Sequence, residues 1–352
     1  MSDTRSPRLE IGKLPVDLLE RLVSRYRGRI RNEVVLHAAV GEDSCAIDPS
    51  EMLVVMSTDP ITGAGEEIGW VSVHISCNDV AANGAEPLGV LVTLLLPPGS
   101  PESELQRVMG GVGSAAREIG VEILGGHTEV TAAVRQALLS TTAIGVAPRG
   151  GLVTKAGASS GDALVMTKAA GLEATAILAA DFGDVLAREL GAGTVERARS
   201  FGGEISVVRE GLVAAGNGAT AMHDATEGGV LGAVYEMAEA AAKAAGHQIG
   251  FTVNLDCVPV RQETESICRI AGVDPLRVVS SGAMLIACRP GDAQGMIRAL
   301  DDASIEARVI GEFTDERRML IAGGRAAPAA PPGPDHIWVA RENLQRLRKA
   351  HG

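Results

Sequence analysis

Acidic and amide side chains recur beside glycines in the first half of this chain, each time at the end of an apolar run. The four segments are Gly41-Glu42-Asp43-Ser44, Ser57-Thr58-Asp59-Pro60, Asn78-Asp79-Val80-Ala81-Ala82-Asn83-Gly84 and Gly125-Gly126-His127-Thr128-Glu129. Mg²⁺ takes oxygen ligands in an octahedron and keeps several waters, so it favours a few carboxylates that converge on substrate phosphates. Glycine lets backbone N–H groups approach those phosphates closely. The pattern therefore predicts a nucleotide site that holds a hard cation.

Three aspartates are the candidate metal ligands: Asp43, Asp59 and Asp79. Each could instead cap a helix or close a turn, because aspartate is favoured at both places for local reasons. Their common position, after apolar segments and near glycines, favours a shared role in binding Mg²⁺. Lys13 and Lys168 lie next to glycine-bearing turns and could neutralise phosphate charge, although solvated surface lysines are the commoner case.

The glycine pair Gly125-Gly126 follows a predicted strand at 121–124. It would open a phosphate-sized concavity at the carboxyl end of that strand, with Thr128 beside it. His127 could bind phosphate, act as an acid or base, or make a structural hydrogen bond. Glu129 would point the same way as His127 if the strand resumes, and could then act as a base.

A loop in the second half, His223–Gly229, joins a predicted strand to a helix. Its Glu227 is a candidate acid or base, although Thr226 and Glu227 could simply cap the helix. The Gly228-Gly229 pair at the helix start would present free N–H groups to an anion.

The composition restricts the class of protein. A chain of 352 residues is expected to form two domains of roughly 150–190 residues each. With 46% apolar residues and only 2% aromatic ones, the core must be mainly aliphatic. The 44 acidic residues outnumber the 32 basic ones, and the net charge of −12 argues against binding to nucleic acid or to an anionic membrane.

The cysteines and the termini exclude further classes. The five cysteines are widely spaced without a Cys-x-x-Cys pair, so we expect buried, reduced thiols rather than structural zinc or disulfides. The segment Met1–Glu10 is polar and lacks the apolar core of a signal peptide. The longest apolar run, Leu88–Leu96, is too short to cross a membrane and predicts a buried strand. We therefore expect a soluble, cytoplasmic protein.

Alternating strands and helices must position these side chains. The first half predicts strands at 33–38, 52–57, 88–96, 121–124 and 136–146, and helices at 14–28, 68–83 and 102–119. The second half predicts strands at 163–168, 219–224, 247–255, 282–288, 304–313 and 317–322, and helices after Gly171, after Gly229, at 260–271 and at 291–303. Residues 324–334 predict a linker, 337–339 a short strand and the remainder a basic helical tail. The fold class is therefore α/β or α+β.

In this order, the motifs resemble those of the aminoimidazole ribonucleotide (AIR) synthetase superfamily, also called PurM-like. The helix motif Asn78-Asp79-Val80-Ala81-Ala82-Asn83-Gly84-Ala85-Glu86-Pro87 is the most specific match. Similar motifs lie at 41–47, 57–61, 125–130, 161–168 and 223–236, so the likeness covers about residues 8–323.

The resemblance implies a two-domain PurM-like fold. Residues 1–155 would form a dimerisation domain that binds ATP and Mg²⁺, residues 156–323 a C-terminal α/β domain, and residues 324–352 a linker and tail. Members form homodimers whose N-terminal sheets meet in a shared barrel. By resemblance, the metal ligands are Asp43, Asp59 and Asp79, the other nucleotide contacts are Asn78, Gly125, Gly126 and Thr128, and the catalytic candidates are Lys13, His127, Glu129 and Glu227. No nucleic acid or membrane partner is implied.

Within the superfamily, the Gly12-Lys13-Leu14-Pro15 turn, the helix start at 171–178 and Thr226-Glu227-Gly228-Gly229 are most similar to the hydrogenase-maturation HypE group. That group dehydrates a thiocarboxamide carried on its own C-terminal cysteine. Here the last cysteine is Cys288, so we expect that the self-carried reaction does not run as in that group.

The resemblance as a whole implies ATP-dependent phosphorylation of a carboxamide- or carboxylate-type oxygen, with or without a following dehydration. One alternative is a non-catalytic assembly partner that responds to nucleotide. Another is a small-molecule kinase of the thiamine-monophosphate kinase or selenophosphate synthetase type.

Overall fold

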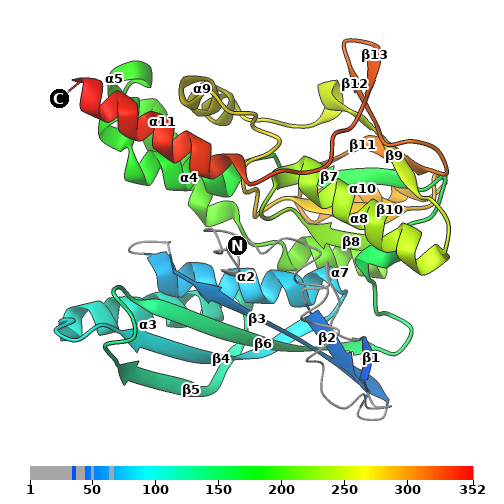
Figure 1. The fold of residues 1–352 in the computed structure, drawn as a ribbon. Helices are drawn as coiled ribbons and strands as arrows, with labels where there is room; N and C mark the ends of the chain where they lie inside the picture. The colour runs from blue at the N-terminus through cyan, green and yellow to red at the C-terminus, as the bar shows by residue number, and fades with distance from the viewer. Residues whose placement is uncertain (1–33, 37–43, 49–50, 63–66, 352) are drawn as a thin grey trace, which may run out of the picture.

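The computed structural model describes residues 34–36, 44–48, 51–62 and 67–351, and all structural statements below concern these residues. The predicted helix at 14–28, Lys13 and Asp43 lie outside them. The chain forms two sheets that are joined by the segment between Pro148 and Ala163 (Figure 1). The mixed α/β class and the two-domain arrangement predicted from the sequence are thus confirmed.

The first sheet has six strands in the order β1-β2-β3-β6-β4-β5. They are β1 (Val34–Leu36), β2 (Ser44–Ile47), β3 (Met52–Ile61), β4 (Glu86–Leu96), β5 (Glu122–Val130) and β6 (Leu138–Pro148). Neighbouring strands are antiparallel except β4 and β5, which are parallel and connected by a helix.

Two helices, α2 (Ile68–Ala82) and α3 (Glu102–Ile119), cover one face of this sheet. They approach each other so closely that a Cβ atom at Gly69 would lie 2.0 Å from the carbonyl oxygen of Val108, so only glycine fits there. Alternate residues of β3, such as Leu53 and Val55, are buried beneath the helices. The opposite face of the sheet carries no helix of the described chain (Figure 1).

The second sheet has seven strands in the order β13-β12-β9-β11-β7-β10-β8. They are β7 (Ala163–Thr167), β8 (Ala219–Asp224), β9 (Gly250–Asn254), β10 (Met284–Cys288), β11 (Ala307–Thr314), β12 (Met319–Ala322) and β13 (Arg325–Pro328). The helices of this half are α4 (Leu172–Asp181), α5 (Gly183–Leu190), α6 (Ala192–Ser200), α7 (Val208–Gly216), α8 (Gly229–Ala245), α9 (Gln262–Ala271), α10 (Ala293–Asp302) and α11 (His336–His351).

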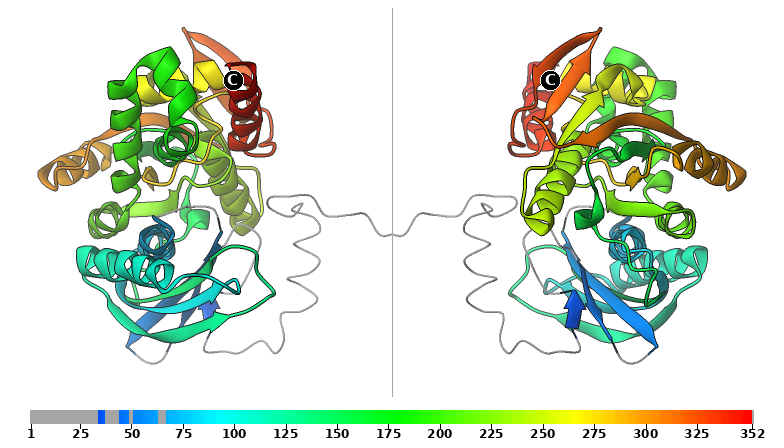
Figure 2. Two further views of the ribbon diagram at one scale, coloured as in Figure 1. Left: turned by 90° about the vertical axis from the view of Figure 1, so that its left-hand side faces the viewer. Right: turned by 90° about the vertical axis from the view of Figure 1, so that its right-hand side faces the viewer.

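The second sheet has an apolar core on each face. Helix α8 packs on one face, and α7 and α10 pack on the other. Helix α7 also packs against α2, so these two helices form much of the contact between the domains (Figure 2). Cores of Val, Leu, Ile, Ala and Met agree with the scarcity of aromatic residues in the sequence.

The C-terminal part differs from its prediction. The apolar triplet Ile337-Trp338-Val339 belongs to helix α11 and not to a strand, because Ile337, Ala340 and Leu344 pack with one side of the helix on α4 and α9. Part of the predicted linker, Arg325–Pro328, pairs with β12 as strand β13.

The apolar run at 88–96 does form a strand, but Leu88 and Leu91 are exposed. No described helix is long and apolar enough to span a membrane. The four cysteines whose side chains the structure describes are free thiols: Cys77, Cys268 and Cys288 are buried and Cys257 is half-buried.

Candidate nucleotide and metal site

Polar side chains line the otherwise apolar contact between α2 and β3. The Ser57 hydroxyl donates a hydrogen bond of 2.6 Å to Oδ2 of Asp79, and both side chains are buried. Asp59 lies two residues after Ser57 and is half-buried, so both point to the face of the sheet that α2 covers. The fold therefore places Asp59 and Asp79 on the two elements, β3 and α2, that meet at Ser57.

The polar contact extends to strand β6, which lies next to β3. Asp59 is the ladder partner of Thr141. The backbone carbonyl of Thr141 accepts a 2.9 Å hydrogen bond from Ser76, and its hydroxyl donates a 3.0 Å bond to Ser72. Because hydroxyls are costly to bury without partners, these bonds hold α2 in one position over Asp59.

The donor atoms at this contact suit Mg²⁺, since carboxylate and hydroxyl oxygens are the ligands of hard cations. Within the described chain, no three His, Cys, Asp or Glu side chains lie close enough together to hold a metal ion. Asp43, the third predicted ligand, lies outside that part. Two carboxylates completed by water and phosphate oxygens are a normal ligand set for Mg²⁺.

Asn78, predicted as a nucleotide contact, joins the two domains. Its amide nitrogen donates to the Ile205 carbonyl at 2.8 Å, and its amide oxygen accepts from the Val207 N–H at 2.8 Å. The side chain is fully buried. Both halves of the Asn78 amide are thus used in the interdomain contact, immediately before Asp79.

The segment Gly125-Gly126-His127-Thr128 is not a loop, because it lies within the edge strand β5. The φ angles of Gly125 and Gly126 are 150° and 146°, a region that favours glycine. A Cβ atom at Gly126 would lie 1.8 Å from the carbonyl oxygen of Val92, so only glycine allows β5 to pair closely with β4 here. Gly126 thus serves strand packing, whereas a Cβ atom at Gly125 would come no closer than 3.7 Å to Leu91. The prediction that the strand ends before this glycine pair is wrong, because β5 continues to Val130.

Strand register relates β5 to the carboxylates. Asp59 pairs with Thr141, Thr141 with Val92, and Val92 with Gly126. Gly126 therefore lies in the same row of the sheet as Asp59, three strand spacings or about 14 Å away. Thr128, two residues further along β5, points to the same side as Gly126.

His127 and Glu129 lie on the other face of the sheet. They alternate with Gly126 and Thr128 along β5, so they point away from the helices and from Asp59. The prediction that they point the same way is confirmed, because His127 Nε2 lies 3.4 Å from Glu129 Oε2. Both side chains are more than half exposed. The described chain thus separates this pair from the metal candidates.

Glu227 lies in the turn before helix α8 and is half-buried. The predicted anion at this helix start is replaced by a side chain of the protein itself, because the Gly228 N–H donates to Asp335 Oδ2 at 2.7 Å. The other oxygen of Asp335 accepts a 2.7 Å bond from the Ile337 N–H and so caps α11. Sequence reasoning missed Asp335, although an aspartate directly before an apolar helix is a normal capping signal.

Buried carboxyl groups gather near this turn. Burial raises the pKa of Glu173, the carboxylates of Asp335 and Asp224 raise it further, and hydrogen bonding to Ser281 opposes the shift. Burial likewise raises the pKa of Asp335. The protonated form of Glu173 is therefore more favoured than that of an exposed glutamate.

The pKa of His223 is shifted in the direction opposite to the effect of burial. Burial and the nearby Lys155 lower its pKa, but hydrogen bonding to Asp224 and Glu236 outweighs them, so the net shift is upward. Its Nε2 lies 2.9 Å from Glu236 Oε2.

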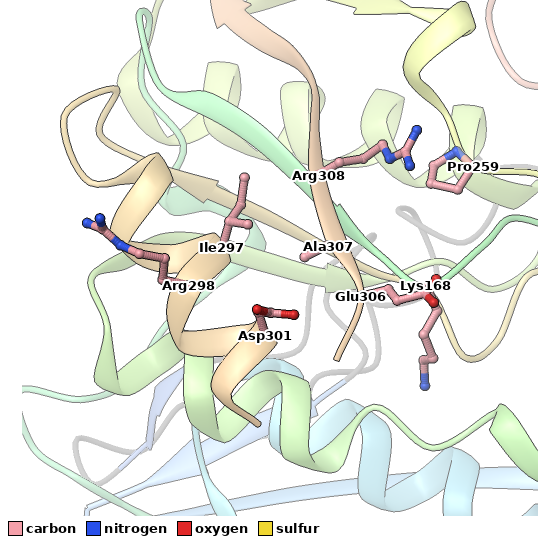
Figure 3. A pocket seen from close by; sticks show the side chains of 8 residues that line it. All are labelled: Lys168, Pro259, Ile297, Arg298, Asp301, Glu306, Ala307 and Arg308. Atoms are coloured by element: carbon pink, nitrogen blue, oxygen red, sulfur yellow. The ribbon is translucent and has the colours of Figure 1, made fainter. Parts of the chain in front are cut away.

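Lys168 is enclosed by the protein rather than open to a phosphate. Its Nζ lies 2.8 Å from Oε1 of Glu210 and donates to the carbonyls of Glu204 and Ser206 at 2.8 and 2.6 Å. Two cavities adjoin it, one of about 290 Å³ beside α10 and one of about 380 Å³ that reaches His74 and Glu118 on the first domain. In Figure 3 the Lys168 side chain points away from Arg298 and Arg308, which line the smaller cavity.

Comparisons with known proteins agree with this architecture. The sequence profiles of AIR synthase related proteins match residues 41–147 with the N-terminal domain and residues 159–322 with the C-terminal domain. A putative hydrogenase expression/formation protein of Methanocaldococcus jannaschii is 30% identical over 287 residues, which cover 80% of this chain and 82% of that protein. A carbamoyl dehydratase HypE of Cupriavidus necator is 30% identical over 291 residues, 80% of this chain and 79% of that protein.

A solved structure of the hydrogenase maturation protein HypE in complex with ATP superimposes with a TM-score of 0.66 at 22% identity. It covers 90% of this chain and 95% of that one. The chain therefore belongs to the AIR synthase-related, PurM-like superfamily. Within that superfamily it groups with the HypE proteins.

Proposed function

We propose that this chain is an ATP-dependent enzyme that phosphorylates a carboxamide- or carboxylate-type oxygen, with Mg²⁺ as cofactor. The observation that carries the proposal is the buried hydrogen bond between Ser57 of β3 and Asp79 of α2, with the half-buried Asp59 two residues from Ser57 on the same face of β3. Relatives named as carbamoyl dehydratases and a HypE structure with ATP support the same class of chemistry. Mg²⁺ would neutralise the transferring phosphoryl group, and the fixed carboxylates would position it.

The acceptor is proposed to be a separate molecule. Cys288 is fully buried in β10, and burial raises the pKa of its thiol to about 11. Cys77 and Cys268 are also buried, and burial raises the pKa of each thiol to about 12. These thiols are therefore poorly placed to carry an acyl group.

We propose that the chain forms a homodimer, and the open face of the first sheet supports this proposal. Leu91, which alternates along β4 with the buried Val90 and Val92, is exposed on this face, and Leu124 on the edge strand β5 is also exposed, although large apolar side chains normally seek burial. β5 is also an edge strand of nine exposed residues, which leaves a row of backbone groups unpaired in the described chain. A second copy would cover both features. It would also place His127 and Glu129, the predicted acid/base pair, at the subunit interface.

The metal assignment is tested by Asp59→Asn. Calorimetric titration with Mg·ATP and detection of released ADP should show binding and slow turnover in the wild type. In Asp59→Asn, the Mg²⁺ dependence of both should be lost while the far-UV circular dichroism is unchanged. Asp302→Asn, an exposed carboxylate at the end of α10, is the matched control and should behave as the wild type. Unchanged turnover in a folded Asp59→Asn protein would remove Asp59 from the site.

A screen of amides, carboxylates and small alcohols for stimulation of ADP release then tests the acceptor. Stimulation by an amide or carboxylate supports the proposal, whereas stimulation only by an alcohol indicates a small-molecule kinase. Binding of ATP without turnover under any acceptor would favour the nucleotide-responsive assembly partner.

The dimer is tested by Leu91→Arg, with Val309→Arg as a control because Val309 is also exposed but lies on the second sheet. Light scattering after gel filtration should give a dimer for the wild type and for Val309→Arg, and a monomer for Leu91→Arg. A monomeric wild type would refute the assignment.

A further inference from the structure

The segment Glu204–Val207 is held from two sides by polar side chains of different domains. Lys168, at the end of β7, donates to the carbonyls of Glu204 and Ser206. Asn78, on α2, binds the carbonyl of Ile205 and the N–H of Val207. Alternate backbone groups of one short segment thus face the second domain and the first domain in turn.

The Lys168 end of this arrangement is fixed by charge. The ammonium group has three N–H donors and three acceptors, the third being the buried carboxylate of Glu210 on α7 at 2.8 Å. Lys168 is also a non-glycine residue with a positive φ of 51°, a conformation that costs free energy and persists only where surrounding contacts enforce it. A neutral residue here would lose all three bonds and leave Glu210 buried without its cation.

The Asn78 end transmits this constraint to the candidate metal site. Asn78 is the residue directly before Asp79 on α2, and Asp79 accepts the Ser57 hydrogen bond. Consecutive helical residues point about 100° apart, so a rotation or shift of α2 that strains the Asn78 bonds also displaces the Asp79 carboxylate.

We infer that Lys168 is a positioning residue for Asp79, acting through the segment Glu204–Val207 and Asn78. This inference rests on the proposed function, because Asp79 is a metal ligand only within it. Lys168 touches neither Asp79 nor Ser57 in the described contacts. Its role is to hold the second-domain segment against which α2, and with it Asp79, takes its position.

The test compares Lys168→Met, which leaves the Glu210 carboxylate without its cation, with the double variant Lys168→Met/Glu210→Met, which leaves no charge behind. Arg197→Met, which removes an exposed cation on α6, is the matched control. The Mg²⁺ concentration for half-maximal binding of a non-hydrolysable ATP analogue is measured by calorimetry. Both Lys168 variants should raise it on the order of two- to thirtyfold, as expected for coupling through packed side chains. Arg197→Met should leave it unchanged.

If Lys168 acts only on overall stability, the effects of the Lys168 and Asp79 substitutions on the Mg²⁺ requirement should add. If it acts through Asp79, they should not. In an Asp79→Asn background, the Lys168 double variant should therefore cause no further change in the Mg²⁺ requirement. Hydrogen exchange of the nucleotide-free protein gives an independent readout. The amides of the last turn of α2 should exchange faster in the double variant, while those of α3 keep their wild-type rates.

The possible failures are distinguishable. If the wild type binds the analogue without any dependence on Mg²⁺, the proposed function itself is overturned. If the wild type binds in a Mg²⁺-dependent manner, but both Lys168 variants keep its Mg²⁺ requirement and its exchange rates in α2, the positioning role alone is overturned.

Discussion

His74 should make the stability of this protein depend on pH in a predictable direction. Its side chain is fully buried on α2, and its ring packs against that of Trp70, with 3.9 Å between the centroids and 40° between the ring planes. Nε2 lies 3.6 Å from Glu118 Oε2, longer than a hydrogen bond, and neither ring nitrogen has a hydrogen-bond partner within the described chain. Burial lowers the pKa of His74 from 6.5 to about 4, although Glu118 acts in the opposite direction.

The direction of this pH dependence follows from the difference in proton binding between the unfolded and the folded protein. Below the ordinary pKa the unfolded chain takes up a proton on His74, whereas the folded protein does not until about pH 4. The contribution of His74 to stability is therefore complete above pH 6.5 and is lost as the pH falls through the window between these two values. Between about pH 7.5 and about pH 5, this group should lower the free energy of unfolding by about 2 kcal/mol.

The variant His74→Phe isolates this contribution, because it keeps an aromatic ring on Trp70 and removes the titrating nitrogens. Denaturant unfolding is measured for both proteins at the two pH values, and the pH dependence of the wild type should exceed that of the variant by about 2 kcal/mol. At the higher pH the variant should be at least as stable as the wild type, since two unsatisfied buried polar atoms are removed. An identical pH dependence in the two proteins would refute the argument.

Three further predictions concern other parts of the fold. Gly126→Ala should destabilise the protein by about 2–3 kcal/mol in denaturant unfolding, because its Cβ would collide with Val92, while Gly150→Ala, which meets no atom within 4 Å, should be neutral. Asp335→Ala should cost about 1–2 kcal/mol through the loss of the α11 cap, and Asp335→Asn should cost less because asparagine also caps helices; equal costs would contradict the capping role. Of the four described cysteines, Cys257 should react first with a thiol reagent under native conditions, as peptide mass spectrometry would show; early labelling of Cys77 or Cys288 would contradict their burial.

Local patterns predicted the elements of this protein well, for a physical reason. The strand at 88–96 and the helices at 68–83 and 102–119 are found as β4, α2 and α3 with ends shifted by at most two residues, because their side chains repeat with the period of the structure. The triplet Ile337–Val339 failed because three consecutive apolar residues have no period. The longer spacing of Ile337, Ala340 and Leu344 after the capping Asp335 would have predicted the helix.

Only part of the site could be predicted. The residue types of each motif can be read from a short stretch of sequence, whereas their arrangement in space depends on distant segments. Period two along β3 puts Ser57 and Asp59 on one face, and this can be read from the sequence. That His127 and Glu129 lie on the opposite face from the carboxylates depends on the strand order β3-β6-β4-β5, which no local pattern contains. The enclosure of Lys168 depends on α7, whose contribution lies some forty residues further along the chain.

The neighbouring residues Asn78 and Asp79 would couple the proposed nucleotide site to the contact between the domains. Asn78 is fixed to the second domain by two hydrogen bonds, and Asp79 accepts a hydrogen bond from Ser57 on β3 of the first domain. Helix α7 of the second domain packs directly against the end of α2, so closely that a Cβ atom at Gly211 would lie 2.3 Å from the carbonyl oxygen of Ala81. Any displacement of the second domain must therefore move the turn of α2 that carries Asp79. By the same contacts, a ligand that fixes Asp79 must resist that displacement, because coupling between two sites is reciprocal.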